Sequence, residues 1–286
     1  MKHNMKKLLL HAAAFLALVI LATGCQKMDR PTLGDFPADT NPVGGPLNFY
    51  VAFDGTTANP LMNAVDSIRG NFASQNPFTT IDGISGKAVQ GINKKTIKYG
   101  KPNDWAEKAK SFTFSFWYKR DGQTKNNAGG NGPEYIASFK SNNGHWSGSS
   151  LLLFLEGNNA ACAVKMMIAD KNNADSWFTW EAGSMIPGLL DNKWHHMSII
   201  YDATASSMTL YVDGVANPNK RFWGTHGDIN INNNSIVEMR IGSGPGDKID
   251  SDDWLSSSWK GGLDQYRMYS KALTAAEIQK LFNSKQ

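Results

Sequence analysis

Tryptophans in polar loops are the residues of this sequence whose surroundings best suit binding chemistry. Trp146 is the clearest case, because the run at 142–148 reads Asn-Asn-Gly-His-Trp-Ser-Gly. An indole can cover the apolar C–H face of a sugar ring while neighbouring polar side chains bond to its hydroxyls. The alternative role for such rings is to pin long loops onto a sheet. The side chains that we predict to contact a ligand are His145, Trp146, Arg221, Trp223 and Trp254.

Metal-binding and nucleophilic chemistry find little support in the residue spacing. His195 and His196 form the only adjacent histidine pair. Neighbours on a strand point to opposite faces, so these two cannot readily share one ligand. The sequence contains neither His-Glu-x-x-His nor a Cys/His spacing for zinc. Cys162 lies in the apolar run Ala-Cys-Ala-Val, which indicates a buried, unreactive thiol. We therefore predict structural roles for all three residues.

The first residues indicate export. Three lysines among the first seven residues precede the apolar run Leu8–Leu21, and Ala-Thr-Gly-Cys follows at 22–25. This is the pattern of a secretory signal, and the run is short for an uncleaved membrane anchor, which is the alternative. Its end resembles a bacterial lipobox. The resemblance implies cleavage after residue 24, acylation of Cys25 and, because Gln26 follows, an outer-membrane lipoprotein. Which side of that membrane the protein faces, the cell surface included, is left open.

The charge balance excludes one class of partner. The whole chain carries a formal net charge of +4 at pH 7. Removal of residues 1–24 takes away three lysines and leaves a nearly neutral protein, which gives no electrostatic basis for binding nucleic acid. Residues 25–46 begin with the cysteine whose acylation the lipobox resemblance implies, and their content of Pro, Gly and Asp predicts a flexible tether. Residues 47–286 suffice for one large domain.

Short strands separated by Gly, Asn and Asp clusters dominate the pattern of that domain. In the run 111–117, three phenylalanines alternate with Thr and Ser, so they share one face of a strand. Many such strands indicate an all-β sandwich or jelly roll. We predict strands at 47–53, 111–117, 134–140, 150–156, 161–169, 176–181, 193–201, 208–212, 236–241 and 263–269.

Turn and helix signals complete the pattern. Asp213-Gly214 supplies the positive φ values of a tight hairpin. Thr274 opens a capping box, Thr-x-x-Glu, which predicts a closing helix at 274–283. A second short helix is predicted at 61–71. The Gly- and Asn-rich run at 125–132 is expected to form a mobile surface loop.

The order of the motifs resembles the laminin-G-like, concanavalin A-like sandwich superfamily. The motifs are Phe-Asp-Gly at 53–55, Gly-Ile-Ser-Gly-Lys-Ala at 83–88, Phe-Thr-Phe-Ser-Phe-Trp at 112–117, Lys-Trp-His-His at 193–196, Leu-Tyr-Val-Asp-Gly at 210–214 and Gly-Gly-Leu-Asp-Gln-Tyr at 261–266. The resemblance implies two antiparallel sheets packed face to face, closed by a short C-terminal helix. It also implies a calcium ion where the first strand meets the last, with Asp54 and Asp264 as ligands; turn or cap roles are the alternative for both.

The resemblance leaves three functional hypotheses. The laminarinase-type branch carries Glu, Asp two residues on and Glu three further, but here no glutamate has an aspartate two residues on. We therefore expect a membrane-tethered, non-catalytic module that binds a glycan at the cell envelope. The alternatives are a structural or protein-interaction component of an envelope complex, and an unconventional glycoside hydrolase whose carboxylates come from distant loops.

Overall fold

The computed structural model of the chain describes residues 45–54, 77–102, 104–171 and 175–285. The strands are β1 (Leu47–Val51), β2 (Thr79–Asp82), β3 (Lys87–Gln90), β4 (Ile97–Tyr99), β5 (Phe112–Asp121), β6 (Glu134–Ser141), β7 (Ser149–Gly157), β8 (Cys162–Ile168), β9 (Ser176–Trp180), β10 (Asp191–Asp202), β11 (Ser207–Val212), β12 (Val215–Ala216), β13 (Arg221–Phe222), β14 (Ile236–Ile241) and β15 (Gly262–Tyr269). The helices are α2 (Trp105–Lys108) and α3 (Ala275–Ser284), with short 3-10 helices η1 (Ala182–Ser184), η2 (Asn233–Ser235) and η3 (Trp254–Ser256).

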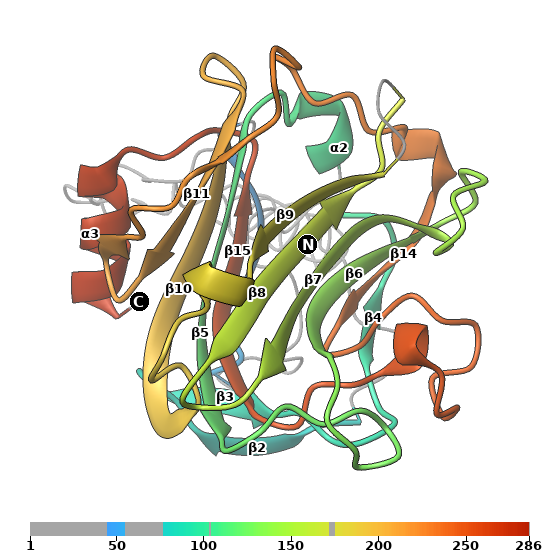
Figure 1. The fold of residues 1–286 in the computed structure, drawn as a ribbon, viewed down its shortest axis with the longest axis vertical. Coiled ribbons are helices and arrows are strands. Elements are labelled where there is room, and N and C mark those ends of the chain that lie inside the picture. Colours follow the sequence, from blue (N-terminus) through green and yellow to red (C-terminus); the bar gives the residue numbers. More distant parts are fainter. Residues whose placement is uncertain (1–44, 55–76, 103, 172–174, 286) are drawn as a thin grey trace, which may run out of the picture. The chain divides into compact units, whose positions relative to one another are not determined.

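Within the described residues the strands form two antiparallel sheets (Figure 1). The first has nine strands in the order β12-β11-β10-β5-β15-β3-β2, with β1 paired to β15 and β13 paired to β11. The second has six, in the order β4-β14-β6-β7-β8-β9. Phe114 on β5 and Phe139 on β6 lie with ring centroids 6.2 Å apart, so the two sheets pack face to face. The predicted antiparallel β-sandwich is confirmed.

Apolar side chains at every second position of the strands build the core between the sheets. Phe112, Phe114 and Phe116 on β5 are fully buried, as the sequence pattern predicts. Trp105 from α2 packs among them and donates from Nε1 to the carbonyl of Tyr269 at 3.1 Å. Cys162 is buried as well, and burial raises the pKa of its thiol to about 12, which agrees with an unreactive role.

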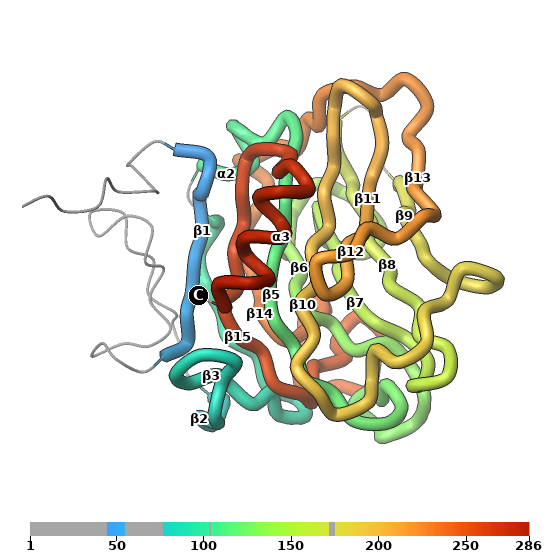
Figure 2. Tube along the Cα trace, turned by 90° about the vertical axis from the view of Figure 1, so that its left-hand side faces the viewer, coloured from blue at the N-terminus to red at the C-terminus, as the bar shows by residue number. Residues whose placement is uncertain are grey.

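The closing helix covers the outer face of the nine-stranded sheet. Figure 2 shows α3 lying over this sheet, in front of β15, β5 and β10. Thr274 caps it, and the reciprocal hydrogen bonds between Thr274 and Glu277 confirm the predicted capping box. From the last turn, Phe282 stacks on Trp117 with centroids 5.6 Å apart. The helix therefore covers the part of this face around Trp117.

The adjacent histidines on β10 have opposite surroundings, as predicted. His195 lies between two carboxylates, with Nδ1 2.8 Å from Asp213 Oδ2 and Nε2 3.0 Å from Asp191 Oδ1. The bond to Asp213, more than any other contact, raises the pKa of His195 above its usual 6.5. His196 lies under α3 with Nε2 2.9 Å from Ser115 Oγ. Burial and the nearby Arg267 lower the pKa of His196 to about 4.

These opposite shifts predict opposite pH dependence for two neighbouring substitutions. A raised histidine pKa stabilises the fold below about 6.5, and this contribution disappears as the pH rises through the raised value. His195→Gln should therefore cost about 1 kcal/mol near pH 5 and less near pH 9. His196 must stay neutral, so the parent loses stability as the pH falls from about 6.5 towards 4, and His196→Gln should remove that loss. Urea unfolding across this pH range measures how the free energy of unfolding of each variant changes with pH. The same pH dependence in both variants would contradict the assignment.

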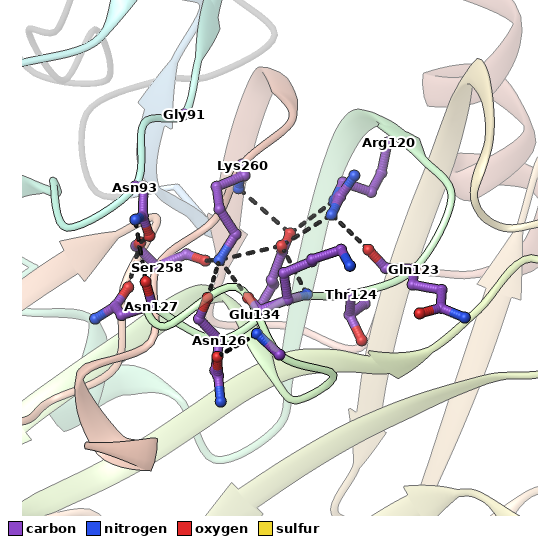
Figure 3. A network of polar contacts seen from close by, with 12 residues as sticks. Gly91, Asn93, Arg120, Gln123, Thr124, Asn126, Asn127, Glu134, Ser258 and Lys260 are labelled. Carbon is purple, nitrogen blue, oxygen red and sulfur yellow. Dashed lines mark hydrogen bonds and ion pairs between the residues drawn. The ribbon is translucent and has the colours of Figure 1, made fainter. Parts of the chain in front are cut away.

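A buried carboxylate anchors the connection between β5 and β6 (Figure 3). The Glu134 side chain is fully buried, and Arg120 donates to its two oxygens from Nε at 2.8 Å and Nη2 at 3.0 Å. Lys260 Nζ lies 3.2 Å from Glu134 Oε1, and the backbone N–H of Lys125 donates to the same oxygen at 3.0 Å. One carboxylate thus joins a guanidinium, an ammonium and a loop backbone.

This network, with a second set of bonds, corrects the expectation of a mobile loop at 125–132. Asn127 is buried and donates from Nδ2 to the carbonyls of Ile249, Ser251 and Ser256. Lys125 also pairs with Asn131 in an isolated bridge. The run is therefore tied to the segment before β15, although its Gly and Asn content is typical of loose loops.

Several sequence predictions fall on residues outside the described ranges. They are the signal at 1–24, Cys25, the tether as far as residue 44, and the helix at 61–71. Among the described residues, none of the helices has the length and apolar character that a membrane crossing requires.

Candidate functional site

Three connecting segments enclose a pocket of about 570 Å³, here named the Trp146 pocket. They are the β6–β7 loop, the described ends of the β8–β9 connection (residues 169–171 and Asp175) and the segment that precedes β14. Amides and carboxylates supply most of its polar lining, a composition suited to a ligand with many hydroxyl groups. The amides and carboxylates are those of Asn142, Asn143, Asp170, Asp175 and Asn232, and the ammonium of Lys171 is the cationic group of the lining.

Trp146 is the exposed aromatic ring of this pocket, with 60 % of its surface accessible. Its Nε1 donates to Asp175 Oδ2 at 3.2 Å, which holds the ring against the β8–β9 connection. His145 lies beside it, with ring centroids 5.4 Å apart, and its Nδ1 lies 2.7 Å from Ser147 Oγ. Nε2 of His145 is buried, lacks a hydrogen-bond partner among the described residues, and lies 3.7 Å from Asp175 Oδ1. The structure thus brings His145 and Trp146 together, and their contact with a ligand stays a prediction.

Asp170 forms a buried wall of the pocket. Its Oδ2 accepts a hydrogen bond from the backbone N–H of Asn230 at 3.0 Å and lies 2.9 Å from His226 Nε2. His226 in turn stacks flat on Trp223, with centroids 3.6 Å apart. Trp223 therefore supports the pocket from behind, through His226 and Asp170, and does not line it.

The structure corrects the expected exposure of Trp223 and shows Arg221 bonded to the backbone of β9. Trp223 is only 9 % exposed and packs edge-on against Phe178 and Tyr201, with centroids 5.1 and 5.5 Å away. Arg221 donates from Nε to the carbonyl of Thr179 at 2.6 Å. A ring enclosed in this way cannot stack on a sugar, and the guanidinium is occupied in joining β13 to β9. Both side chains serve the packing of the sandwich.

Trp254 lies elsewhere, on the outer face of the six-stranded sheet. Trp254 and Trp177 both stand nearly perpendicular to the ring of Phe154, with centroids 5.3 and 6.2 Å from it. Trp177 is 38 % exposed. The two indoles flank a smaller pocket of about 250 Å³, here named the Trp254 pocket. Its lining residues are Phe154, Lys165, Trp177, Thr179, Glu181 and Trp254.

The two predicted calcium ligands meet at one turn. Asp264 Oδ2 accepts a hydrogen bond from the backbone N–H of Ile84 at 2.8 Å, and Asp54 Oδ1 accepts one from that of Lys87 at 3.1 Å. Gly86, at φ +64°, lets Asp54 approach: a Cβ there would lie 2.2 Å from Asp54 Oδ1. Burial, and then the charge of Asp54, raises the pKa of Asp264 to about 7.

The donor set at this turn fits a cation in part. Asp264 Oδ1 is buried and has no hydrogen-bond partner among the described residues, so it is free to coordinate. Within those residues no group of three or more His, Cys, Asp or Glu side chains could hold a metal ion. Asp54 and Asp264 would therefore hold calcium together with backbone carbonyls, which Ca²⁺ accepts readily.

Solved structures with the same fold come from binding domains. The binding domain of Paraclostridial Mosquitocidal Protein 1 is 17 % identical, with a TM-score of 0.57 over 84 % of this chain and 52 % of that one. The binding domain of botulinum neurotoxin DC, solved in complex with SialylT, is 13 % identical, with a TM-score of 0.56 over 84 % and 51 %. The chain thus spans about half the length of these toxin domains.

A further structure matches over nearly its whole length. Domain 4 of AbnA, a GH43 extracellular arabinanase from Geobacillus stearothermophilus, was solved in complex with arabinotriose. It is 16 % identical, with a TM-score of 0.52 over 82 % of this chain and 97 % of that one. No curated protein matches the sequence. Residues 95–279 match the family described as the concanavalin A-like lectin/glucanases superfamily, and the chain therefore belongs to that family.

Proposed function

We propose that this protein is a non-catalytic glycan-binding module whose sugar site is the Trp146 pocket. One observation carries the proposal: a largely exposed indole, held by Asp175, borders a pocket lined with amides and carboxylates. Such a ring covers the C–H face of a sugar, and the polar groups around it match hydroxyls. The titles of the similar toxin and arabinanase domains, which name SialylT and arabinotriose, support a glycan as ligand.

Two glutamates near the Trp254 pocket support the absence of hydrolysis. Glu156 and Glu181 both pair with Lys165, at 2.9 and 2.6 Å. The hydrogen bond from Lys165 lowers the pKa of Glu181 below its usual value. A glycosidase needs a general acid with a raised pKa, so the lowered pKa of Glu181 does not suit it for that role.

Attachment to a membrane is a second part of the proposal. We propose that Cys25 carries the lipid and that the protein is an outer-membrane lipoprotein. The basic start, the apolar run and the cysteine at the end of the signal support this assignment. Cells grown with radiolabelled palmitate should label the parent protein but not Cys25→Ser, and equal labelling of the two would contradict lipid anchoring at this residue.

A glycan array followed by titration calorimetry tests the sugar site. Trp146→Ala should weaken binding of an array hit about tenfold, or ~1.4 kcal/mol, through loss of the stacking surface. The melting temperature should stay near that of the parent, because Trp146 is mostly exposed. Phe222→Ala is the matched control: its ring is 72 % exposed and lies on β13, outside the Trp146 pocket.

Two outcomes would contradict the proposal. Equal affinities for the parent and Trp146→Ala would remove the Trp146 pocket as the sugar site. A blank array from a folded protein would favour a protein partner, for which the exposed Phe222 and Val215 on β13 and β12 offer an apolar contact.

We also propose calcium as a structural cation between Asp54 and Asp264. At about a hundredfold excess over its Kd, a ligand of the native state adds ~2.7 kcal/mol of stability. Calcium should therefore raise the melting temperature and a chelator should lower it. Asp264→Asn should abolish the calcium response, whereas Asp82→Asn, at an exposed carboxylate beside the same turn, should keep it. A melting temperature that ignores both calcium and chelator would remove the cation from this turn.

A further inference from the structure

One strand connects the two pockets. Residues of β9 alternate: Phe178 and Trp180 face the core, whereas Trp177 and Thr179 face outwards. Asp175, two residues before Trp177, belongs to the Trp146 pocket, and Trp177 belongs to the Trp254 pocket. The outer face of a single strand therefore passes from one pocket to the other within a few residues.

The neighbouring strands repeat this arrangement. On β7, Ser150 lines the Trp146 pocket and Phe154 lines the Trp254 pocket. Ala169, directly after β8, and Lys165 on β8 line the same two pockets in turn. The members of each pair lie four positions apart in the sequence, which corresponds to about 13 Å along a strand. Figure 1 shows β7, β8 and β9 running side by side. The two pockets thus lie on one face of one sheet, farther apart than one sugar ring can span.

The path between the pockets follows β9. Leu152 on β7 and Met167 on β8 lie between the pockets but are fully buried, so neither side chain can contact a ligand. Trp177, paired with Met167 in the sheet register, is exposed. Trp146 and Trp177 are therefore two accessible indoles, with Asp175 bonded to the first and two residues from the second.

The charges along this path disfavour an anionic ligand. In the Trp146 pocket the carboxylates of Asp170 and Asp175 outnumber the ammonium of Lys171. Lys165 is neutralised by Glu156 and Glu181, with Nζ–Oε distances of 2.9 and 2.6 Å. Burial alone would lower the pKa of Lys165, but the two carboxylates outweigh it and raise that pKa. The ammonium is thus committed to protein partners and is not available to a uronate or a sulfate.

We propose that the Trp146 pocket and the Trp254 pocket are the two ends of one site along β9, and that its ligand is a linear, uncharged glycan chain bound along its length. The proposal rests on the glycan-binding function proposed above and specifies the ligand class. Two exposed indoles on one sheet face can stack on different rings of one chain, and two linked contacts bind more tightly than either contact alone.

A chain-length series separates the two ideas. The probes are linear cello-, laminari-, xylo- and arabino-oligosaccharides, from dimers to hexamers, titrated calorimetrically into the full-length protein. Affinity should rise with length in the series that binds. Trp177→Ala should weaken hexamer binding about tenfold and leave dimer binding near the parent value, whereas Trp146→Ala should weaken both. Thr179→Arg, which places a long side chain on the path, should reproduce the effect of Trp177→Ala, and Phe222→Ala should have none.

The outcomes distinguish the two proposals. If dimers bind as tightly as hexamers, or if Trp177→Ala affects no length, the extended site is wrong and the Trp146 pocket alone stands. If the parent binds none of these oligosaccharides while the glycan array gives hits, the ligand is not a linear neutral chain and the inference fails by itself. If the array is blank as well, both proposals fail.

Discussion

Glu134→Ala is expected to destabilise the protein by about 3–5 kcal/mol, because it leaves two buried cations without their shared counter-ion. Arg120 and Lys260 both bond to this carboxylate, and all three side chains are largely or fully removed from water. Burial already lowers the pKa of Lys260, although Glu134 acts in the opposite direction, so without Glu134 its charge has less support. Urea unfolding near neutral pH measures the loss.

Asp247→Ala is the control for Glu134→Ala. Asp247 also pairs with a lysine, Lys140, but its own side chain is 93 % exposed. A surface pair contributes about 0–1 kcal/mol, so this variant should unfold close to the parent. The loop at 125–132 provides a second measurement: proteolysis there should increase in Glu134→Ala only. Similar stabilities for the two variants would show that the buried network does not hold the loop.

Trp223→Ala should cost about 3–5 kcal/mol, the usual result of emptying a buried aromatic site. The ring packs against Phe178 and Tyr201 and carries His226 on its face. Loss of this support should also release Asp170, so sugar binding should weaken even where the variant stays folded. Thermal unfolding reports the first effect, and calorimetry well below the melting temperature reports the second.

The neighbouring residue on β13 gives a matched comparison. Phe222 is 72 % exposed, and a surface substitution of this kind changes stability by about 0.5 kcal/mol or less. Phe222→Ala and Trp223→Ala thus remove aromatic rings at adjacent positions with opposite burial. A small effect at Trp223 would mean that this ring is not part of the core.

The sandwich could be predicted from the sequence because its signals are local. The alternating phenylalanines of 112–116 and the Thr274 capping box each fix an element within a few residues, and both are present as predicted. The short strands β2, β3 and β4 were missed because each is only three or four residues long. A run of that length carries too little alternation to distinguish it from a loop.

The lining of the Trp146 pocket could not be predicted in full, because it depends on contacts between distant segments that no local sequence pattern encodes. Trp146 and Trp223 both lie in polar loops, yet one is exposed and the other is enclosed by rings from β9 and β10. Asp170 and Asp175 enter the Trp146 pocket from a loop more than twenty residues along the chain. Asn127 similarly donates hydrogen bonds to carbonyls more than a hundred residues away in the sequence. Burial of a loop side chain is decided by such distant segments.

The position of β15 has a consequence for the order of events during synthesis. This last strand pairs with β5, β3 and β1, and it brings Tyr269 opposite Leu47 at the other end of the domain. A nascent chain that ends before Gly262 therefore has all the other strands of the nine-stranded sheet but not the one that joins them. Pairings this distant in sequence form slowly, because a long loop must close first. The sheet is thus completed after the ribosome has added the final strand, and not progressively as the chain emerges.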